Sequence, residues 1–213
     1  MVGTGRLLGV GFGTRRFEAD AAVRHAFYTR NFGRSGESRT GARLFFLVMS
    51  ELRNGGRDRP KFLCDAMLGS LARWLRFFGF DATYLEPGVP DRVLADMARS
   101  EHRWLLTRDR ELSTVGPRTL LVRSETLEDQ LVEVFSRLAL RPAAHLEQSR
   151  CGECNGVLQD VEREEVAPVL PPFVLATAPR FRCCIRCGRV YWPGTHGARI
   201  VARMQSVFDR LND

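Results

Sequence analysis

Long apolar runs and a clear export signal are both missing from this sequence. The longest uninterrupted apolar stretch, Leu44 to Met49, has six residues, whereas a helix that crosses a bilayer needs about 20. The apolar run Leu7 to Phe12 is short, is broken by Gly9 and Gly11, and precedes no clear small-residue cleavage site. We therefore expect a soluble, cytoplasmic protein with no membrane partner, in which the six cysteines stay reduced.

A surplus of positive charge is nearly absent from most of the chain. The formal net charge of the 213 residues is +7, but residues 1–59 hold 11 Arg and 5 acidic residues, a balance of +6. Residues 60–213 hold 21 basic and 20 acidic residues, a balance of +1. Any surface in this larger part that attracts phosphate must therefore depend on basic groups that folding brings together.

Residues 1–58 also lack a sustained hydrophobic period of 2 or 3.6, and they are rich in Arg and Gly. Two interpretations stay open for residues 1–59: a basic, disordered extension, or a true translation start at Met49 with artefactual residues before it. A small N-terminal domain is the less favoured third interpretation.

From Lys61 the sequence alternates between short apolar runs and segments with a helical period. This alternation predicts an α/β domain over residues 60–142, with a mostly parallel sheet covered by helices on both faces. Residues 143–213 contain cysteine pairs, turns and a closing helix near 198–211, and they form a second, smaller unit. The expected strands are 61–64, 81–84, 103–107 and 119–122, and the expected helices begin near Met67, Asp91 and Ser124.

Acidic residues follow two of the predicted strands. Asp65 comes directly after the first strand, and Asp109 follows the third. Because ligand sites in parallel sheets lie at the carboxyl ends of the strands, we expect the two carboxylates at one edge. Asp91, at the start of the second helix, is our choice as a third acid. Such a cluster would hold Mg²⁺ or Mn²⁺, which prefer carboxylate oxygens and support phosphodiester cleavage.

Other acids and a purely structural role remain as alternatives. Asp96 is the substitute for the third ligand, and Glu125 and Asp129 are candidates for a fourth. In the structural interpretation, Asp65 and Asp91 cap helices and Asp109 begins a turn.

Four basic residues lie near the two main aspartates. Arg73 and Arg76 are on the helix after Asp65, and Arg108 and Arg110 flank Asp109, so each is a candidate for contact with an RNA phosphate. An equally simple interpretation makes them solvent-exposed partners of acids. Ser70 either binds a phosphate or bonds back within its helix.

Two CxxC motifs near the end of the chain predict a structural zinc site. Cys151 and Cys154 form the first motif, and Cys184 and Cys187 form the second. Four thiolates around Zn²⁺ leave no open coordination position, so this metal is not expected to be catalytic. Cys183 would give an unfavourable C-x3-C spacing.

The function of the predicted ribbon is open. Its aromatic residues either stack on RNA bases or pack the ribbon against the first domain. The residues concerned are Tyr191, Trp192 and His196.

The sequence resembles the Mut-seven C-terminal RNase domain family over roughly residues 60–200. The resemblance is carried by the segments Phe62–Arg76, Leu106–Asp109, Gly79–Asp81, Gln130–Leu131 and Tyr191–His196, which appear in the expected order.

The resemblance implies a PIN-like three-layer domain followed by a zinc ribbon. It matches Asp65 and Asp109 to metal-binding aspartates, and Asp91 less closely. Family members have either no N-terminal extension or a ubiquitin-like domain, and residues 1–59 resemble neither, which favours a start at Met49.

We therefore expect a ribonuclease that depends on Mg²⁺ or Mn²⁺ and carries a structural Zn²⁺, with RNA as its partner. The first alternative is a non-catalytic adaptor that binds RNA or ribosomes. The second is a toxin-like PIN nuclease that an inhibitory protein partner controls. The sequence indicates neither the RNA substrate nor the oligomeric state.

Overall fold

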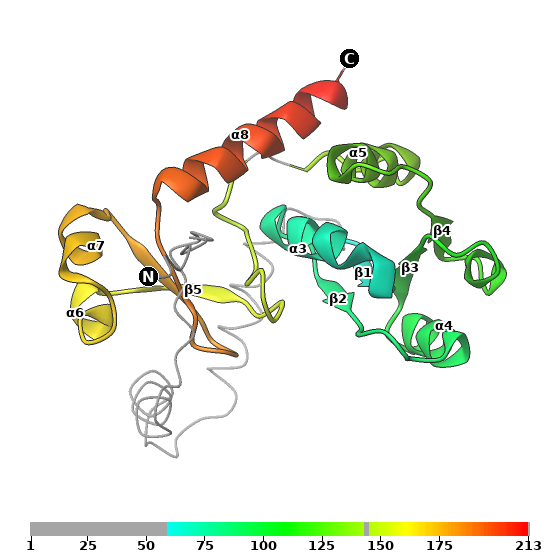
Figure 1. Ribbon diagram of the computed structural model, residues 1–213, viewed down its shortest axis with the longest axis horizontal. Helices are drawn as coiled ribbons and strands as arrows, with labels where there is room; N and C mark the ends of the chain where they lie inside the picture. The colour runs from blue at the N-terminus through cyan, green and yellow to red at the C-terminus, as the bar shows by residue number, and fades with distance from the viewer. Residues whose placement is uncertain (1–58, 143–144, 213) are drawn as a thin grey trace, which may run out of the picture. The chain divides into compact units, whose positions relative to one another are not determined.

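The computed structural model describes residues 59–142 and 145–212 (Figure 1). The predictions for residues 1–58, including the start at Met49, lie outside the described residues. Over the described ranges, none of the helices combines the length and apolar character that a membrane crossing requires.

The first part of the chain forms a four-stranded sheet in which all strands are parallel and the order is β2-β1-β3-β4. The predicted α/β class is therefore confirmed. Its strands are β1 (Lys61–Cys64), β2 (Ala82–Tyr84), β3 (Arg103–Thr107) and β4 (Thr119–Leu121). Its helices are α3 (Gly69–Phe77), α4 (Asp91–Ser100) and α5 (Leu127–Arg137), with 3-10 turns η1 (Ala66–Leu68) and η2 (Leu112–Thr114).

The alternation of side chains along β1 separates two apolar layers. Phe62 and Cys64 belong to the larger cluster, which includes residues of α3 and α5, whereas Leu63 packs with Leu94 and Ala98 of α4. Successive residues of a strand point to opposite faces, so helices cover both sides of the sheet. The result is the three-layer arrangement that the sequence predicts (Figure 1).

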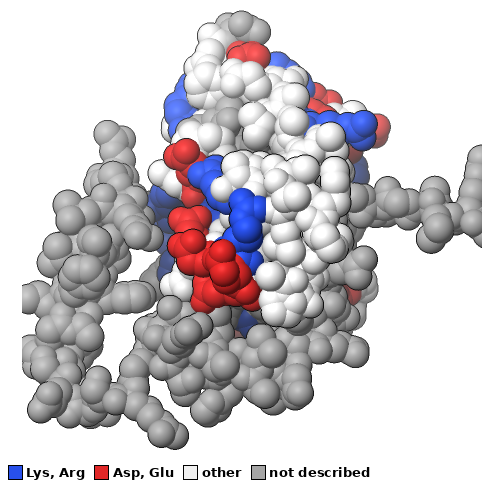
Figure 2. All heavy atoms as spheres, turned by 90° about the vertical axis from the view of Figure 1, so that its left-hand side faces the viewer, with Lys and Arg blue, Asp and Glu red and all other residues white. Residues whose placement is uncertain are grey.

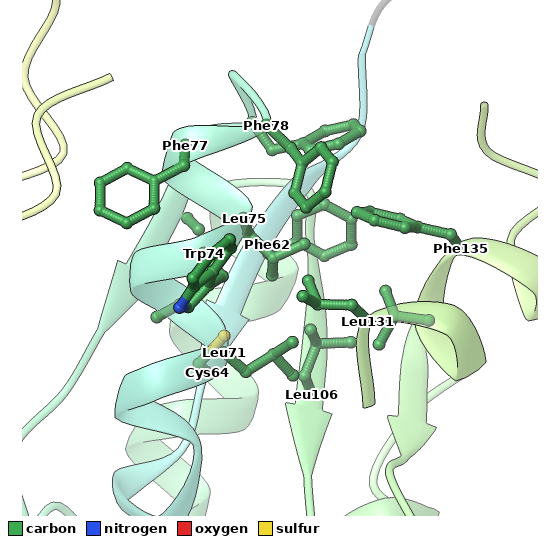
Figure 3. Close-up of a cluster of buried hydrophobic side chains, with 14 of the residues drawn as sticks. Phe62, Cys64, Leu71, Trp74, Leu75, Phe77, Phe78, Leu106, Leu131 and Phe135 are labelled. Carbon is green, nitrogen blue, oxygen red and sulfur yellow. The ribbon is translucent and has the colours of Figure 1, made fainter. Parts of the chain in front are cut away.

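Aromatic and leucine side chains fill the larger layer. Phe62 meets Phe80 edge to face with ring centroids 5.4 Å apart, and Phe78 meets Phe135 in the same way at 5.1 Å. Burying a side chain of this size stabilises the fold by about 1.5–3 kcal/mol. Figure 3 shows that Phe77, by contrast, points away from Phe78 and Phe135.

The second part contains an antiparallel sheet and a long closing helix. The sheet order is β5-β6-β7, with β5 (Leu158–Val161), β6 (Phe181–Cys184) and β7 (Val190–Tyr191). Two short helices that the sequence pattern did not predict lie between β5 and β6, namely α6 (Arg163–Val166) and α7 (Pro172–Thr177). The chain then forms α8 (Thr195–Arg210).

Helix α8 packs against the first part of the chain. Ile200, Met204 and Val207 belong to the larger apolar cluster around α3 and α5. The guanidinium of Arg203 lies 5.2 Å from the ring centroid of Trp74 and forms an ion pair with Glu128. A cation over an indole ring is attracted by the ring's electrons. These contacts attach the end of the chain to α3 and α5.

Candidate functional site

β1 and β3 lie at the point where the order in which the chain adds strands to the parallel sheet reverses. The chain runs from β1 to β2 on one side and then returns to β3 on the other side of β1. In open parallel sheets, such a switch point leaves a crevice beyond the carboxyl ends of the strands. Asp65 and Asp109 follow the two strands that flank this point.

The Asp65 carboxylate is fixed by donors from both strand ends. It is 5% exposed, and its Oδ1 accepts a hydrogen bond from the Met67 amide at 2.9 Å. Its Oδ2 accepts hydrogen bonds from the Thr107 hydroxyl and, at 3.1 Å, from the Arg108 amide. Asp65 is thus the N-cap of η1, and at the same time it connects the end of β1 to the end of β3.

Thr107 links Asp65 to Asp109. Its buried hydroxyl donates to Asp65 and accepts a hydrogen bond from the Asp109 amide at 2.9 Å. The exposed Asp109 carboxylate uses Oδ1 to accept from the amides of Glu111 and Leu112, at 2.6 and 3.1 Å. The predicted capping and turn roles of both aspartates are therefore confirmed. Oδ2 of Asp109 has no hydrogen-bond donor among the described residues.

Asp91 is the first residue of α4 and is exposed. Because α4 follows β2 in the chain, Asp91 begins the helix near the edge of the sheet where the carboxyl ends of the strands lie. Among the described residues, however, the group that can hold a metal ion is made of cysteines, and Asp65, Asp91 and Asp109 do not form such a group.

The alternative acids have other partners. Asp96 forms ion pairs with Arg99 at 2.8 Å and with Arg92 at 4.0 Å, within α4. Asp129 accepts hydrogen bonds from the Thr126 hydroxyl and from Arg210 of α8, and these two bonds, in this order, lower the pKa of its carboxyl. Glu125 is exposed just before α5.

Four of the five predicted phosphate-binding residues have accessible side chains, and the fifth, Arg76, is buried. Ser70 and Arg110 are exposed, and Arg108 is partly buried beside Asp65. The Arg73 side chain is 53% exposed and lies 3.6 Å from a Glu153 carboxylate oxygen. All four residues remain accessible to a substrate.

Arg76 requires a correction, because its side chain lies in the interior and binds backbone carbonyls. It is 7% exposed, and Nε donates to the Ala82 carbonyl at 2.8 Å. Nη1 donates to the carbonyls of Gly152 and Glu153 at 2.9 and 3.1 Å. Burial lowers the pKa of its guanidinium. Arg76 therefore joins β2 to the first cysteine turn, and we remove it from the predicted phosphate contacts.

The four predicted cysteine ligands come together. The sulfur atoms of Cys151, Cys154, Cys184 and Cys187 all lie within 4.8 Å of one another. The Cys151–Cys187 and Cys154–Cys184 sulfur distances are 3.6 and 3.4 Å. Four ligands at about 2.3 Å from a tetrahedral Zn²⁺ would be roughly 3.8 Å apart. The donor set and its spacing fit such an ion, which is consistent with the predicted zinc ribbon.

The backbone around the sulfurs is adapted to close approach. Asn155 and Gly188, each directly after the second cysteine of a pair, have φ of 65° and 71°. A Cβ atom on Gly156 would lie 2.7 Å from the Cys184 sulfur, so only glycine fits there without displacement. The two CxxC turns and Gly156 together form a cradle that a larger residue would fill.

Hydrogen bonds already favour one thiolate in this cluster. The neighbouring Cys184 thiol, and then the Tyr191 hydroxyl 3.0 Å from the Cys151 sulfur, lower the pKa of Cys151, although burial opposes this effect. The same contact raises the pKa of Cys184. Four negative sulfurs at these distances would repel one another, and a divalent cation would remove that repulsion.

A polar network next to the first cysteine pair was not foreseen from the sequence. The Asp81 carboxylate accepts hydrogen bonds from Arg103 at 2.6 Å and from the Asn155 side chain at 2.7 Å. Asn155 also accepts a hydrogen bond from the Ala82 amide at 3.2 Å. The only signal for it was Gly79-Phe80-Asp81, a motif of the family resemblance. These bonds join the ribbon to the edge strand β2.

The aromatic residues of the ribbon have mixed environments. Trp192 is partly buried and packs against the apolar cluster of Val166, Phe181 and Val190. His196 lies in the first turn of α8 and is also partly buried. Figure 2 shows acidic and basic side chains beside one another on the face that carries α6 and α7, so this face has no uniformly basic surface.

The first part of the chain is a three-layer α/β domain with carboxylates after adjacent parallel strands. A ribbon with four clustered cysteines follows it. Together they define a PIN-like protein with a ribbon. The family model described as Mut7-C RNAse domain matches residues 60–204, and the chain belongs to this family. Membership indicates a nuclease-type function with RNA as the substrate class. Neither the curated proteins nor the solved structures include a match to this chain.

Proposed function

We propose that the protein is a metal-dependent ribonuclease that hydrolyses RNA phosphodiester bonds at the carboxyl edge of the parallel sheet. The observation that carries the proposal is the placement of Asp65. Its buried carboxylate is held by Thr107 and Arg108 at the end of the adjacent strand, directly before Asp109. Fixed acidic oxygens at a switch point suit a hard divalent cation.

Asp65, Asp109 and Asp91 are the residues that would hold Mg²⁺ or Mn²⁺. Such an ion, when bound, supplies an activated water and charge stabilisation for the leaving oxygen. Thr107 keeps the Asp65 carboxylate in place, and the free Oδ2 of Asp109 is its available ligand atom. Asp91 is exposed, and in the described arrangement its carboxylate does not form one metal-binding group with the other two acids.

Substrate contacts are assigned to accessible residues near the same edge. Ser70 and Arg73 lie in α3, which begins just after Asp65, and Arg108 precedes Asp109. Hydrogen bonds from such side chains to phosphate oxygens position a strand without reading its sequence. A Zn²⁺ held by the four cysteines of the cradle would have no open coordination position and would take no part in the reaction.

Asparagine substitutions test the acidic site. Asp65→Asn and Asp109→Asn are each expected to lower the rate of RNA cleavage at least about 100-fold, because each removes a charged ligand. Circular dichroism and one bound zinc per chain would establish that the variants are folded. Asp209→Asn, an exposed change in α8, serves as the control. Unchanged cleavage by a pure, folded Asp109→Asn protein would exclude the proposed site.

The third ligand can be identified with the same assay. Asp91→Asn is expected to lower cleavage and to raise the Mn²⁺ concentration needed for half-maximal activity. Asp96→Asn should change neither quantity, because Asp96 is engaged by arginines of its own helix. The reverse result would transfer the role to Asp96.

A non-catalytic RNA-binding adaptor is the second candidate function. It is favoured by one observation, which is that the three carboxylates do not form a metal-binding group among the described residues. Crystals soaked in millimolar Mn²⁺ separate the two candidates. Bound Mn²⁺ between Asp65 and Asp109 supports the ribonuclease, whereas an ion-free edge together with tight RNA binding supports the adaptor.

A further inference from the structure

A cavity of about 430 Å³ lies beside the ribbon, away from the acidic edge. We call it the ribbon pocket. Its walls come from the end of α3, the segment His145–Arg150, strands β5 to β7, residues 192–194 and the first turns of α8. Ligand pockets in proteins typically begin at about 300 Å³, so this cavity is large enough for a nucleoside.

Apolar and aromatic side chains dominate the walls. Phe77, which turns away from the aromatic core in Figure 3, lines one side. Leu158 and Val201 form further apolar surface, and Tyr191 and Trp192 contribute aromatic groups. Every nucleobase has a flat apolar face, and aromatic side chains bind such faces without regard to base identity.

Arg180 and Arg182 line the pocket together with the acidic Glu147. Arg182 is fixed by hydrogen bonds from Nη1 to the Leu146 carbonyl and from Nη2 to the Leu158 carbonyl. Arg180 also lines the pocket, is exposed, and forms no ion pair or hydrogen bond with described residues. Burial lowers the pKa of Arg182, and the charge of Arg180 adds to this, whereas Asp160, 3.6 Å away, and the pocket-lining Glu147 act in the opposite direction. Asp160 and Glu147 thus partly balance the charge of Arg182, and the exposed Arg180 is the cation with which an added anion would pair.

The pocket keeps open space where the sequence has a glycine. Gly197 lies in the first turns of α8, and a Cβ atom at this position would meet no other atom within 4 Å. Glycine in a helix costs about 0.5–1 kcal/mol relative to alanine, and no close contact of the backbone explains this one. An open, largely apolar space that glycine preserves is suited to a ligand.

We propose that the ribbon pocket binds one nucleobase of an RNA strand, with an adjacent phosphate on Arg180. This inference rests on the proposed function and adds a second contact for the same substrate. Helix α3 begins beside the acidic edge and ends at Phe77 in the pocket wall. Its nine residues rise about 12 Å. An RNA that occupies both places must therefore extend over several nucleotides.

Filling the pocket tests the proposal without removing any packing side chain. Gly197→Leu places a side chain in the open space, and Ala202→Leu, on an exposed position of the same helix, is the matched control. Binding of a fluorescein-labelled RNA of about twelve nucleotides is measured by anisotropy without Mg²⁺ or Mn²⁺. We expect the Kd to rise about tenfold in Gly197→Leu, the loss of one stacked base, and to stay unchanged in Ala202→Leu. Equal Kd values for both variants and the wild type would overturn the proposal.

The chemistry of the ligand is tested by changing the probe. A strand of the same length with abasic sites should bind the wild type about tenfold more weakly than the RNA, and should not distinguish wild type from Gly197→Leu. Equal binding of the abasic strand would overturn the nucleobase assignment. Adenosine monophosphate should compete only weakly with the labelled RNA. If it competes as effectively as the unlabelled whole strand, the assignment to an RNA strand is overturned and the pocket is assigned to free nucleotides. Arg180→Ala should reduce the dependence of Kd on salt by about one counterion.

The pocket and the acidic edge can fail independently. Cleavage of a dinucleotide, which is too short to reach both places, should be the same in Gly197→Leu and wild type. If the wild type cleaves no RNA but Gly197→Leu still weakens binding, the proposed nuclease function fails and the pocket stands. If cleavage is present and Gly197→Leu binds the longer RNA normally, the pocket fails and the nuclease function stands.

Discussion

Replacement of Arg76 by methionine is the most informative test of how the two parts of the protein depend on each other. Methionine has a similar length but no hydrogen-bond donor. The change removes three hydrogen bonds, to the carbonyls of Ala82, Gly152 and Glu153. It therefore leaves acceptors unpaired in a mostly buried position and removes one of the two connections between β2 and the first CxxC turn, while the hydrogen bond from the Ala82 amide to Asn155 remains.

The expected cost follows from the number and kind of these bonds. A hydrogen bond from a charged group contributes roughly 1.5–3 kcal/mol, but the variant no longer has to bury a guanidinium. We expect a net loss of about 3 kcal/mol in the free energy of unfolding. For a chain of this size, that loss corresponds to a fall in Tm of roughly 6–12 °C. Zinc release should be about tenfold faster, because the carbonyls belong to the turn that holds two of the ligands.

Urea unfolding followed by circular dichroism measures the first quantity, and transfer of zinc to a chromophoric chelator measures the second. Arg73→Met is the matched control on the same helix. Its side chain is 53% exposed and its ion pair with Glu153 spans 3.6 Å, so a change of about 0–1 kcal/mol is expected. If the free energy of unfolding of Arg76→Met lies within about 0.5 kcal/mol of the wild type and zinc is released at the same rate, Arg76 does not couple the two parts of the protein.

Two further changes test the ribbon and its attachment. Gly156→Ala should weaken zinc binding at least about tenfold in a chelator competition, because its Cβ would meet the Cys184 sulfur at 2.7 Å. Gly116→Ala is the control, because a Cβ at that position meets no atom within 4 Å. Equal zinc affinity in the two variants would refute the steric explanation. Burial alone would raise the pKa of Asp81, but hydrogen bonds from Arg103 and Asn155 outweigh it, so that the pKa is lowered from 3.8. Because the folded-state pKa is depressed, Asp81 contributes stability above about pH 4 that is lost as the pH falls through the lower folded value. Asp81→Asn should lower the free energy of unfolding by about 3 kcal/mol, and this difference from the wild type should be constant from about pH 6 to 8. The difference should become smaller below about pH 4. A difference that does not change with pH would contradict this explanation.

The sequence predicted the elements of the parallel sheet well because each one has a local pattern. The apolar run that becomes β1 ends at Cys64, directly before Asp65, in both the prediction and the structure, and α4 begins at Asp91 as expected. The cysteine cradle was equally predictable, since CxxC spacing is a local property. Helix α7 carried a usable signal in Pro172, which occupies its first turn.

Long-range contacts account for what the sequence did not predict. Nothing in the pattern around Arg76 distinguishes it from Arg73, although one is buried and the other half-exposed. The difference arises because carbonyls more than seventy positions away come to lie beside Arg76. The distance between Asp91 and the other acids depends in the same way on how α4 packs on the sheet, which periodicity does not specify.

The position of α8 in the chain has a consequence for synthesis on the ribosome. Its residues Ile200, Met204 and Val207 complete the apolar cluster that α3 and α5 begin. Those two helices emerge first, and they must wait for the whole ribbon to be translated before their partner appears. During this interval their apolar surface is open to chaperones or to other nascent chains. A message that ends before codon 195 would therefore yield a sheet with its acidic edge in place but with an uncovered, aggregation-prone flank.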